Sequence, residues 1–188
     1  MKTTDFHGYH ELADTAVYQR AAVVRLLALD VDGVLTDGGL YMSGQGELLK
    51  AFHIHDGKGL AMLREAGIEI ALLTARRSEI LLRRAEELRI RHVLQGREPK
   101  WPALEALLGE LQIAPAQTAY IGDDLVDLPV LRRVGLAATV ADGHPWVARH
   151  CHWQAKRGGG QGAVRELCEL ILDAQGALLP ILERHALD

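Results

Sequence analysis

Hydrophobic runs alternate with amphipathic stretches along most of the chain. The runs are short and apolar almost throughout, which is typical of strands that are buried on both faces of a sheet. They lie at residues 23–29, 68–73, 91–94, 118–121 and 136–140. Helical patterns separate the later runs, at residues 59–65, 78–88, 101–111 and 125–134. Strands that alternate with helices of this length indicate βαβ crossovers, so the sequence predicts an α/β fold with a doubly wound parallel sheet.

Two segments depart from this alternation. Residues 38–53 contain two short β-like runs around a glycine-containing turn, Ser43-Gly44-Gln45-Gly46, and predict a β-hairpin flap. A glycine-rich stretch at residues 156–162 precedes a further amphipathic helix. The hairpin is too short to form a large cap domain. We therefore expect an N-terminal extension at 1–21, one α/β domain at 22–175 and a C-terminal tail at 176–188.

Composition narrows the class of protein. The chain has 188 residues, of which 48% are hydrophobic and 24% charged, and this suits one globular domain. A formal net charge of −4 argues against nucleic acid as a partner. No apolar run approaches the ~18 residues of a membrane helix, and the first residues lack the apolar core of a signal peptide. We expect a cytoplasmic protein without a membrane partner, in which Cys151 and Cys168 are reduced thiols.

Polar side chains follow three of the predicted strands. Asp30 and Asp32 come directly after the first strand, Thr74 follows the second, and Asp123 follows the fourth. The carboxyl ends of parallel strands meet at one edge of a sheet, so these groups should share one crevice. Clustered carboxylates repel each other, and an oxygen-rich set of this kind favours Mg²⁺. Together with Lys100, the set predicts phosphoryl transfer through an aspartyl nucleophile and a second aspartate as acid and base.

The order of these motifs is that of a known family. The segments DVDGVLTDG at 30–38 and GDDLVD at 122–127, with Thr74 and Lys100, resemble the haloacid dehalogenase superfamily of phosphatases. Within it, the hairpin and the segments KAFHIHDGKG, QGREPK, ADGHP and GGGQGAVREL are similar to the 3-deoxy-D-manno-octulosonate 8-phosphate phosphatase family. The resemblance covers about residues 22–175. It implies a Rossmann-like core, a Mg²⁺ cofactor and a small anionic sugar-acid phosphate as substrate.

The resemblance also implies roles for individual residues. Asp30 would be the nucleophile and a metal ligand. Asp32 would be the general acid and base, and its backbone carbonyl would bind the metal. Asp123 would be the second carboxylate ligand. Thr74 and Lys100 would contact the phosphoryl group. The residues implied in substrate binding are Asp32, His53, His55, Asp56, Gly57, Arg76, Arg84, Lys100 and Asp124.

Several of these positions have alternative explanations. The family usually has Asn and Arg where this chain has His53 and His55, so substrate recognition could differ. The two histidines could instead bind a metal or form a plain polar face. Thr74 could cap the following turn, and Arg84 could be a solvated helix residue. Asp127 could begin a helix ahead of Pro129.

The resemblance favours hydrolysis of 3-deoxy-D-manno-octulosonate 8-phosphate, a step in lipopolysaccharide precursor biosynthesis. A nine-carbon nonulosonate 9-phosphate is the alternative substrate. A receiver-like phospho-aspartate module is a different class, but receivers place their phospho-acceptor alone on a later strand, and no aspartate ends the strand at 91–94. A non-catalytic binding partner is disfavoured by the intact acidic set.

Closely similar enzymes are tetramers in which the hairpins assemble and a neighbour's C-terminal segment covers the site. The resemblance therefore implies a homotetramer. The covering segment would be residues 156–162, whose glycines permit a close backbone approach. Deletion from Lys156 onward is expected to impair mainly turnover or product release.

Overall fold

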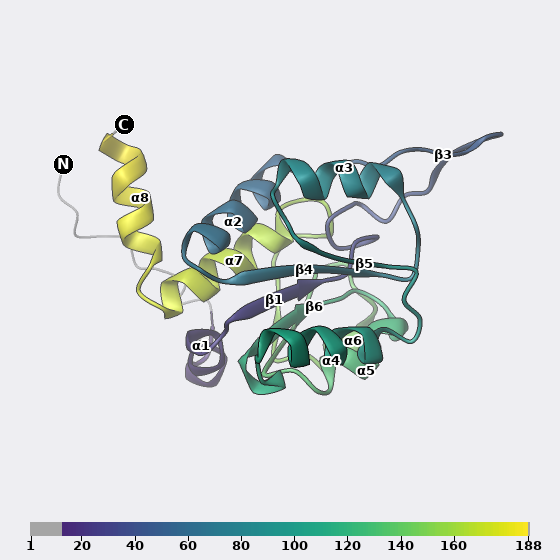
Figure 1. Ribbon diagram of the computed structural model, residues 1–188. Helices are drawn as coiled ribbons and strands as arrows, with labels where there is room; N and C mark the ends of the chain where they lie inside the picture. Colours follow the sequence, from purple (N-terminus) through teal and green to yellow (C-terminus); the bar gives the residue numbers. More distant parts are fainter. Residues whose placement is uncertain (1–12, 188) are drawn as a thin grey trace.

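The computed structural model describes residues 13–187. Its centre is a parallel sheet with the strand order β5-β4-β1-β6-β7-β8 (Figure 1). The strands of this sheet are β1 (Leu26–Leu29), β4 (Glu69–Thr74), β5 (His92–Gln95), β6 (Thr118–Ile121), β7 (Leu136–Thr139) and β8 (Trp153–Gln154). β1 lies in the middle and pairs in parallel with β4 on one side and β6 on the other. The predicted doubly wound α/β fold is confirmed.

Helices cover both faces of the sheet. They are α1 (Thr15–Ala22), α2 (Ile54–Glu65), α3 (Glu79–Glu87), α4 (Lys100–Leu111), α5 (Leu128–Leu131), α6 (Pro145–Ala148), α7 (Ala163–Ala174) and α8 (Leu178–Leu187), with 3₁₀ turns at Pro115–Gln117 and Leu125–Asp127. Alternate side chains of β1 point to opposite faces. Leu27 and Leu29 pack with α1, α2, α3 and α7, whereas Leu26 and Ala28 pack with α4, α5 and α6. This two-sided burial explains why the strands are apolar throughout.

Some predicted boundaries differ from the structure. The helix predicted at 59–65 begins earlier, at Ile54, so the HIHDG segment lies at its start and within its first turn. The helix predicted at 125–134 is reduced to a 3₁₀ turn and the short α5, in which Pro129 lacks a backbone N–H.

The last strand of the sheet, β8, is short, and His152 directly precedes it. The backbone N–H of His152 donates to the Ala137 carbonyl, and its Nδ1 accepts from the Ala137 N–H.

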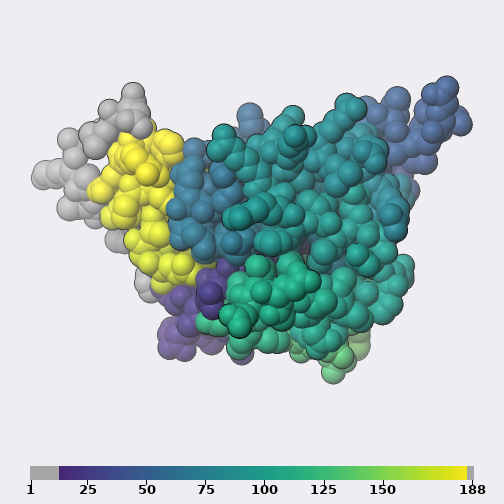
Figure 2. Space-filling model, viewed as in Figure 1, coloured from purple at the N-terminus to yellow at the C-terminus, as the bar shows by residue number. Residues whose placement is uncertain are grey.

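The predicted hairpin lies between β1 and α2. It consists of β2 (Tyr41–Ser43) and β3 (Gly46–Leu49), which pair antiparallel. An antiparallel bridge between Thr36 and Phe52 closes its base. The hairpin projects from the body of the molecule (Figures 1 and 2) and exposes apolar side chains, with Leu48 63% exposed. Between β1 and α2 the chain forms only a loop and this hairpin, in agreement with the expectation of a short flap in place of a large cap.

The C-terminal helices differ in their packing. α7 belongs to the core, because Val164, Leu167 and Ile171 are fully buried. α8 stands at the end of the molecule away from the hairpin (Figure 1). Across residues 13–187, every helix is too short or too polar to cross a membrane. The division at residues 21/22 and 175/176 stays a prediction, and most of the expected N-terminal extension, residues 1–12, lies outside the described residues.

Candidate active site

Three carboxylates gather at the carboxyl end of the central strands. Asp30 directly follows β1, and its N–H continues the ladder by donating to the Ile121 carbonyl of β6 at 3.0 Å. Asp123 comes two residues after β6, and Asp127 lies one turn further on. Oxygen atoms of Asp30, Asp123 and Asp127 all lie within 4.8 Å of one another. The convergence of Asp30 and Asp123 follows the expectation from the strand ends.

Two glycines provide the space that the carboxylates of this cluster occupy. Gly33 has φ +87°, and a Cβ at this position would lie 2.2 Å from Asp123 Oδ2. A Cβ at Gly122 would lie 2.4 Å from the carboxyl carbon of Asp127. Any larger residue would push the carboxylates apart, so glycine is required at both positions.

Lys100, the first residue of α4, supplies a buried positive charge. Its Nζ lies 2.8 Å from Asp30 Oδ1 and donates to Asp127 Oδ1 at 2.6 Å. The Tyr120 hydroxyl donates to the same Asp127 oxygen at 2.6 Å. The other Asp127 oxygen accepts from the backbone N–H groups of Asp123 and Asp124, at 3.0 and 3.2 Å. Asp127 thus fixes both the lysine and the loop after β6, a role beyond the helix start that the sequence suggested.

Burial and mutual repulsion change the acidity of these groups. Burial, followed by the charge of Asp127, raises the pKa of Asp30 to about 6, although Lys100 opposes the change. Burial and the charges of Asp30 and Asp127 raise the pKa of Asp123 to about 7. Burial alone would lower the pKa of Lys100, but Asp127 and Asp30 outweigh it and raise this pKa. The cluster therefore has an excess of negative charge that a cation would relieve.

The acidic cluster fits a magnesium ion. Asp123 Oδ1 is buried and has no hydrogen-bond partner within the described chain. A buried carboxylate oxygen without a partner is costly, and a hard cation would remove that cost. The cluster offers only oxygen ligands, which suits Mg²⁺ better than zinc.

Two threonines complete the loops around the cluster. Thr74 ends β4, is 3% exposed, and accepts a hydrogen bond from the Arg76 N–H at 3.1 Å. This is the turn-capping contact that the sequence allowed, and the hydroxyl can still donate a bond to a ligand. Thr36 Oγ1 accepts from the N–H groups of Gly33 and Gly38, at 3.3 and 3.4 Å, and so shapes the loop after β1.

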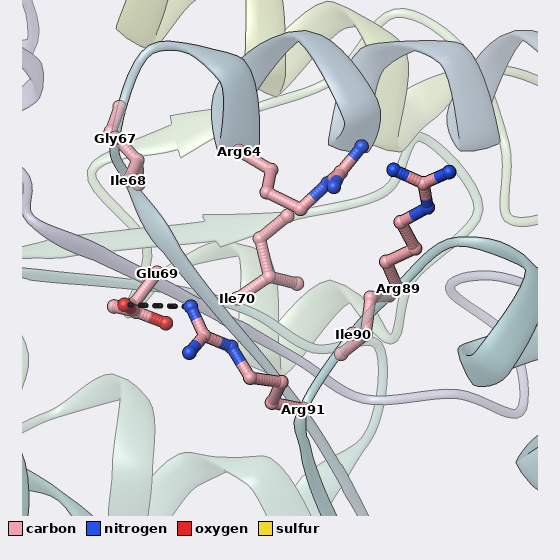
Figure 3. A pocket seen from close by; sticks show the side chains of 8 residues that line it. All are labelled: Arg64, Gly67, Ile68, Glu69, Ile70, Arg89, Ile90 and Arg91. Atoms are coloured by element: carbon pink, nitrogen blue, oxygen red, sulfur yellow. Dashed lines mark ion pairs between the residues drawn. The ribbon is translucent and has the colours of Figure 1, made fainter.

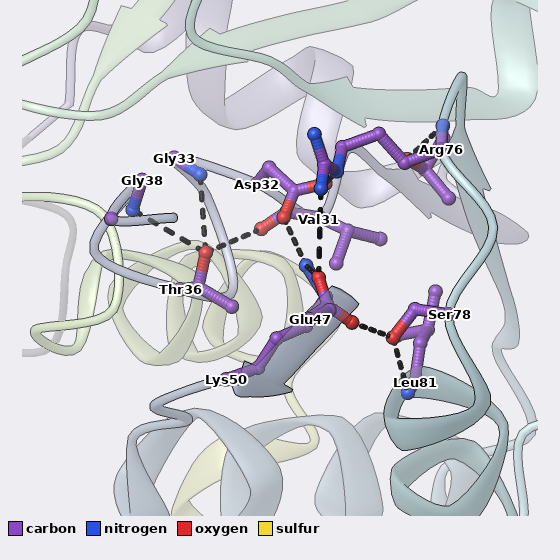
Figure 4. A network of polar contacts seen from close by, with 12 residues as sticks. Val31, Asp32, Gly33, Thr36, Gly38, Glu47, Lys50, Arg76, Ser78 and Leu81 are labelled. Carbon is purple, nitrogen blue, oxygen red and sulfur yellow. Dashed lines mark hydrogen bonds and ion pairs between the residues drawn. The ribbon is translucent and has the colours of Figure 1, made fainter. Parts of the chain in front are cut away.

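Asp32 faces a second set of charges at the base of the hairpin (Figure 4). Its carboxylate accepts a hydrogen bond from Lys50 Nζ and lies 3.8 Å from Arg76 Nε. Lys50 and Arg76 also pair with Glu47 of β3, at 3.0 and 3.7 Å. Lys50 and Glu47 were not among the sequence-predicted site residues. The available signal was a glutamate and a lysine three residues apart in the hairpin, close to the acidic motif.

The remaining substrate-binding candidates cluster around the start of α2. His53 caps α2, and its ring lies edge-on to that of His55 at a centroid distance of 5.0 Å. Asp56 is buried and accepts from the Arg165 N–H at 2.8 Å, so it joins α2 to α7. The Arg84 guanidinium lies 5.7 Å above the Phe52 ring.

Gly57 provides the space for Arg84, since a Cβ there would lie 2.5 Å from Arg84 Nη2. Arg84 also pairs with Glu87 at 3.1 Å. Asp124 is exposed, and its carboxylate accepts from the Leu125 N–H at 2.7 Å. These contacts fix the positions of the Arg84 and Asp124 side chains.

A separate hollow of about 110 Å³ lies at the opposite edge of the sheet, at the start of β4 and β5 (Figure 3). Arg64, Arg89 and Arg91 line it together with Glu69, which pairs with Arg91 at 3.8 Å. Its lining lacks the clustered carboxylates that phosphoryl transfer needs. The chemistry therefore belongs to the carboxyl edge of the sheet.

The fold and the acidic site define a class of protein. A family model for haloacid dehalogenase-like hydrolases matches residues 56–135. A solved structure of 3-deoxy-D-manno-octulosonate 8-phosphate phosphatase from Moraxella catarrhalis, in complex with magnesium, phosphate and KDO, superposes with a TM-score of 0.88. It is 41% identical and covers 90% of this chain and 97% of that one.

The relatives narrow the class. The 3-deoxy-D-manno-octulosonate 8-phosphate phosphatase of Yersinia pestis is 49% identical over 170 residues, which cover 90% of each chain. The phosphatase of the same name from Escherichia coli K12 is 46% identical and covers 86% of each chain. The present chain belongs to the 3-deoxy-D-manno-octulosonate 8-phosphate phosphatase family of haloacid dehalogenase-like hydrolases, and it is a phosphoric monoester hydrolase.

Proposed function

We propose that this protein hydrolyses 3-deoxy-D-manno-octulosonate 8-phosphate to KDO and inorganic phosphate with Mg²⁺ as cofactor. The observation that carries the proposal is the pairing of buried Lys100 with Asp30 beside two further carboxylates. The names of the relatives, and the magnesium, phosphate and KDO in the Moraxella structure, support the substrate and the cofactor.

In the proposed reaction, a carboxylate oxygen of Asp30 attacks the phosphorus atom. The bond between phosphorus and the oxygen on C8 of the sugar breaks, and Asp32 donates a proton to that oxygen. Asp32 then takes a proton from water, which attacks the phosphorus of the aspartyl phosphate. The bond between the Asp30 oxygen and phosphorus breaks, and inorganic phosphate leaves. Asp30 is then again a carboxylate and Asp32 is again protonated.

The metal ligands would be the side chains of Asp30 and Asp123 and the backbone carbonyl of Asp32. Magnesium supplies charge neutralisation at the transferring group. Lys100 adds a fixed positive charge beside Asp30 that is already in place before the reaction. Thr74 would donate a hydrogen bond to a phosphoryl oxygen.

We propose that the sugar acid contacts the residues around the start of α2 and the loop after β4. His55 is exposed at the start of α2, Arg76 is 41% exposed in the loop after β4, and Asp124 is exposed in the loop after β6. The buried Asp56 and the glycine at 57 would act by holding α2 and Arg84 in place. The proposed substrate-binding set is Asp32, His53, His55, Asp56, Gly57, Arg76, Arg84, Lys100 and Asp124.

A homotetramer in the cytoplasm is the state that we propose. The exposed leucine and methionine side chains of the hairpin support assembly through this element, since large exposed apolar patches mark interaction sites. Coverage of a neighbour's site by residues 156–162 stays a prediction that depends on this assembly.

The proposal is tested with a panel of eight- and nine-carbon keto-acid phosphates ranked by kcat/KM. We expect the eight-carbon 8-phosphate to rank first, activity to require Mg²⁺, and excess EDTA to abolish it. Asp30→Asn should remove turnover, because an amide cannot serve as the attacking carboxylate. If a nine-carbon 9-phosphate ranked first, the proposed substrate would be wrong but the proposed mechanism would still hold. Full activity in EDTA or in Asp30→Asn would refute the mechanism.

A further inference from the structure

Four charged side chains meet at the base of the hairpin: Asp32 from the loop after β1, Glu47 and Lys50 from the hairpin, and Arg76 from the loop after β4 (Figure 4). Two are acidic and two are basic, so the set is balanced in charge. The set joins Asp32, the proposed general acid and base, to the hairpin, which projects from the body of the molecule.

Lys50 is the centre of this set. Its side chain is only 4% exposed, and burial of an ammonium group is costly unless carboxylates compensate it. Asp32 and Glu47 provide that compensation, on either side of Nζ. Arg76 also spans both acids, but at 3.8 and 3.7 Å and with a side chain that is 41% exposed. The Lys50 contact with Asp32 is therefore the tighter of the two.

Glu47 is itself held in place. Its second carboxylate oxygen accepts a hydrogen bond from the Ser78 hydroxyl. Ser78 in turn accepts from the Leu81 N–H and caps α3. A chain of contacts thus runs from α3 through Glu47 and Lys50 to one oxygen of Asp32.

We propose that Lys50 is a positioning residue for Asp32, and that the hairpin, through Lys50 and Glu47, aligns the acid and base of the reaction. This rests on the proposed role of Asp32. A carboxyl group that donates a proton to the leaving oxygen, and as a carboxylate later takes one from water, needs a fixed orientation. A displacement of about 1 Å can cost about 10²-fold in rate. Without Lys50, the Asp32 side chain would lose its tightest contact.

The test compares two substrates in Lys50→Met, which keeps the length of the buried side chain. The first substrate is the keto-acid phosphate with the highest kcat/KM in the panel above. It is an alkyl phosphate, so its leaving oxygen needs a proton. 4-Nitrophenyl phosphate has a leaving group that needs none, so its first turnover bypasses the acid. We expect kcat for the alkyl phosphate to fall by roughly 10-fold or more, with the ~10²–10⁴-fold contribution of general acid and base catalysis as the upper bound.

With 4-nitrophenyl phosphate, the first turnover of Lys50→Met should stay within about 2-fold of the wild-type rate, and later turnovers should slow, which gives a burst of nitrophenolate. A loss of packing alone would slow both substrates equally and produce no burst. A raised KM at unchanged kcat for both substrates would instead make Lys50 a direct substrate contact and overturn the proposal.

A double-mutant cycle with Asp32→Asn separates action through Asp32 from any other role. If Lys50 acts through Asp32, adding Lys50→Met to Asp32→Asn should change the rate by less than about 2-fold. Additive losses would refute the proposal. Lys50→Arg, which keeps the charge, should recover part of the rate.

Lys58→Met is the matched control, because Lys58 is exposed on α2 and its Nζ contacts His185 of α8 at 3.0 Å instead of the hairpin set. It should leave both rates unchanged. Asp32→Asn alone tests the underlying mechanism: if it slows both substrates equally in the first turnover, the proposed role of Asp32 fails. If Asp32→Asn discriminates between the substrates and a folded Lys50→Met does not, only the inference about Lys50 fails.

Discussion

At the scale of single residues, Asp127 shows how a buried charge can organise a site. It is fully buried, yet it accepts hydrogen bonds from Lys100, Tyr120 and two backbone N–H groups. A carboxylate that accepts this many bonds needs no metal to satisfy it. Asp123 has an oxygen without a partner in the described chain, so a metal would satisfy it. Within one cluster, Asp127 therefore has a structural role and Asp123 is the better metal ligand.

The first prediction concerns Lys100. Lys100→Met keeps most of the buried volume but removes the charge beside Asp30. We expect kcat to fall more than KM rises, because that charge matters most when negative charge develops on the transferring group. Steady-state kinetics with the preferred substrate measure this. A rise in KM alone would make Lys100 a uniform binding contact. Thermal unfolding of the variant controls for loss of the fold, since Asp30 and Asp127 lose a partner.

At the scale of elements, the glycine-rich segment before α7 packs against the nucleophile loop of its own protomer. The Gly160 N–H donates to the Val34 carbonyl at 3.0 Å, and the Gly159 N–H donates to Asp142 Oδ1 at 2.9 Å. A Cβ at Gly159 would lie 1.9 Å from the Gly33 carbonyl oxygen. In the described chain these glycines therefore approach the loop after β1 of their own protomer, and their approach to a neighbour's site stays a prediction.

The second prediction follows from that contact. Gly159→Ala should lower both kcat and the melting temperature, because either this segment or the loop after β1 has to move. Gly109→Ala is the control, since a Cβ there meets no atom within 4 Å on the exposed side of α4. That substitution should stabilise the protein by about 0.5–1 kcal/mol and leave kcat unchanged. Wild-type kcat in Gly159→Ala would show that the segment does not position the site.

At the scale of the whole molecule, the acidic cluster links metal, pH and stability. Asp30 and Asp123 have pKa values of about 6 and about 7, above the 3.8 of a solvated aspartate. At pH values between 3.8 and these raised pKa values, the two carboxyl groups stay protonated in the folded state but have lost their protons in the unfolded chain. The stability of the metal-free protein should therefore fall as pH rises from about 4 to about 7.

The third prediction is that Mg²⁺ stabilises the protein more at about pH 8 than at about pH 5.5. Metal and protons compete for the same carboxylates, so binding weakens as the acids become protonated. Melting temperatures with and without Mg²⁺ at the two pH values measure the difference. Asp123→Asn should reduce the gain at the higher pH. An equal gain at both values would contradict the assignment of the metal to these residues.

The fourth prediction concerns assembly. Light scattering should give a mass four times that of the 20.6 kDa chain. Leu48→Glu, at a position that is 63% exposed on the hairpin, should dissociate the tetramer, whereas Leu82→Glu, 40% exposed on α3, should not. A fully active monomer would contradict the tetramer. Deletion from Lys156 is a poorer test than the sequence suggested, because it removes α7 and with it part of the core.

The sequence by itself determined five of the six strands of the sheet, their parallel arrangement and the placement of Asp30, Thr74, Lys100 and Asp123 at one edge of the sheet. These features follow from local patterns: burial on both faces makes a strand apolar, and each site residue stands at the end of its own element. The family motifs added chemical roles to the same residues.

Only the tertiary structure decided how these residues are held. Lys100 and Asp127 are 27 positions apart, Lys50 and Asp32 are 18 apart, and Asp56 and Arg165 are 109 apart. No local period relates such pairs, because each contact depends on how two separate elements pack. The sequence could therefore place the acidic residues at the carboxyl ends of their strands. The contact of Lys50 with Asp32, and the contact of Gly159 with the loop after β1, became visible only in the folded chain.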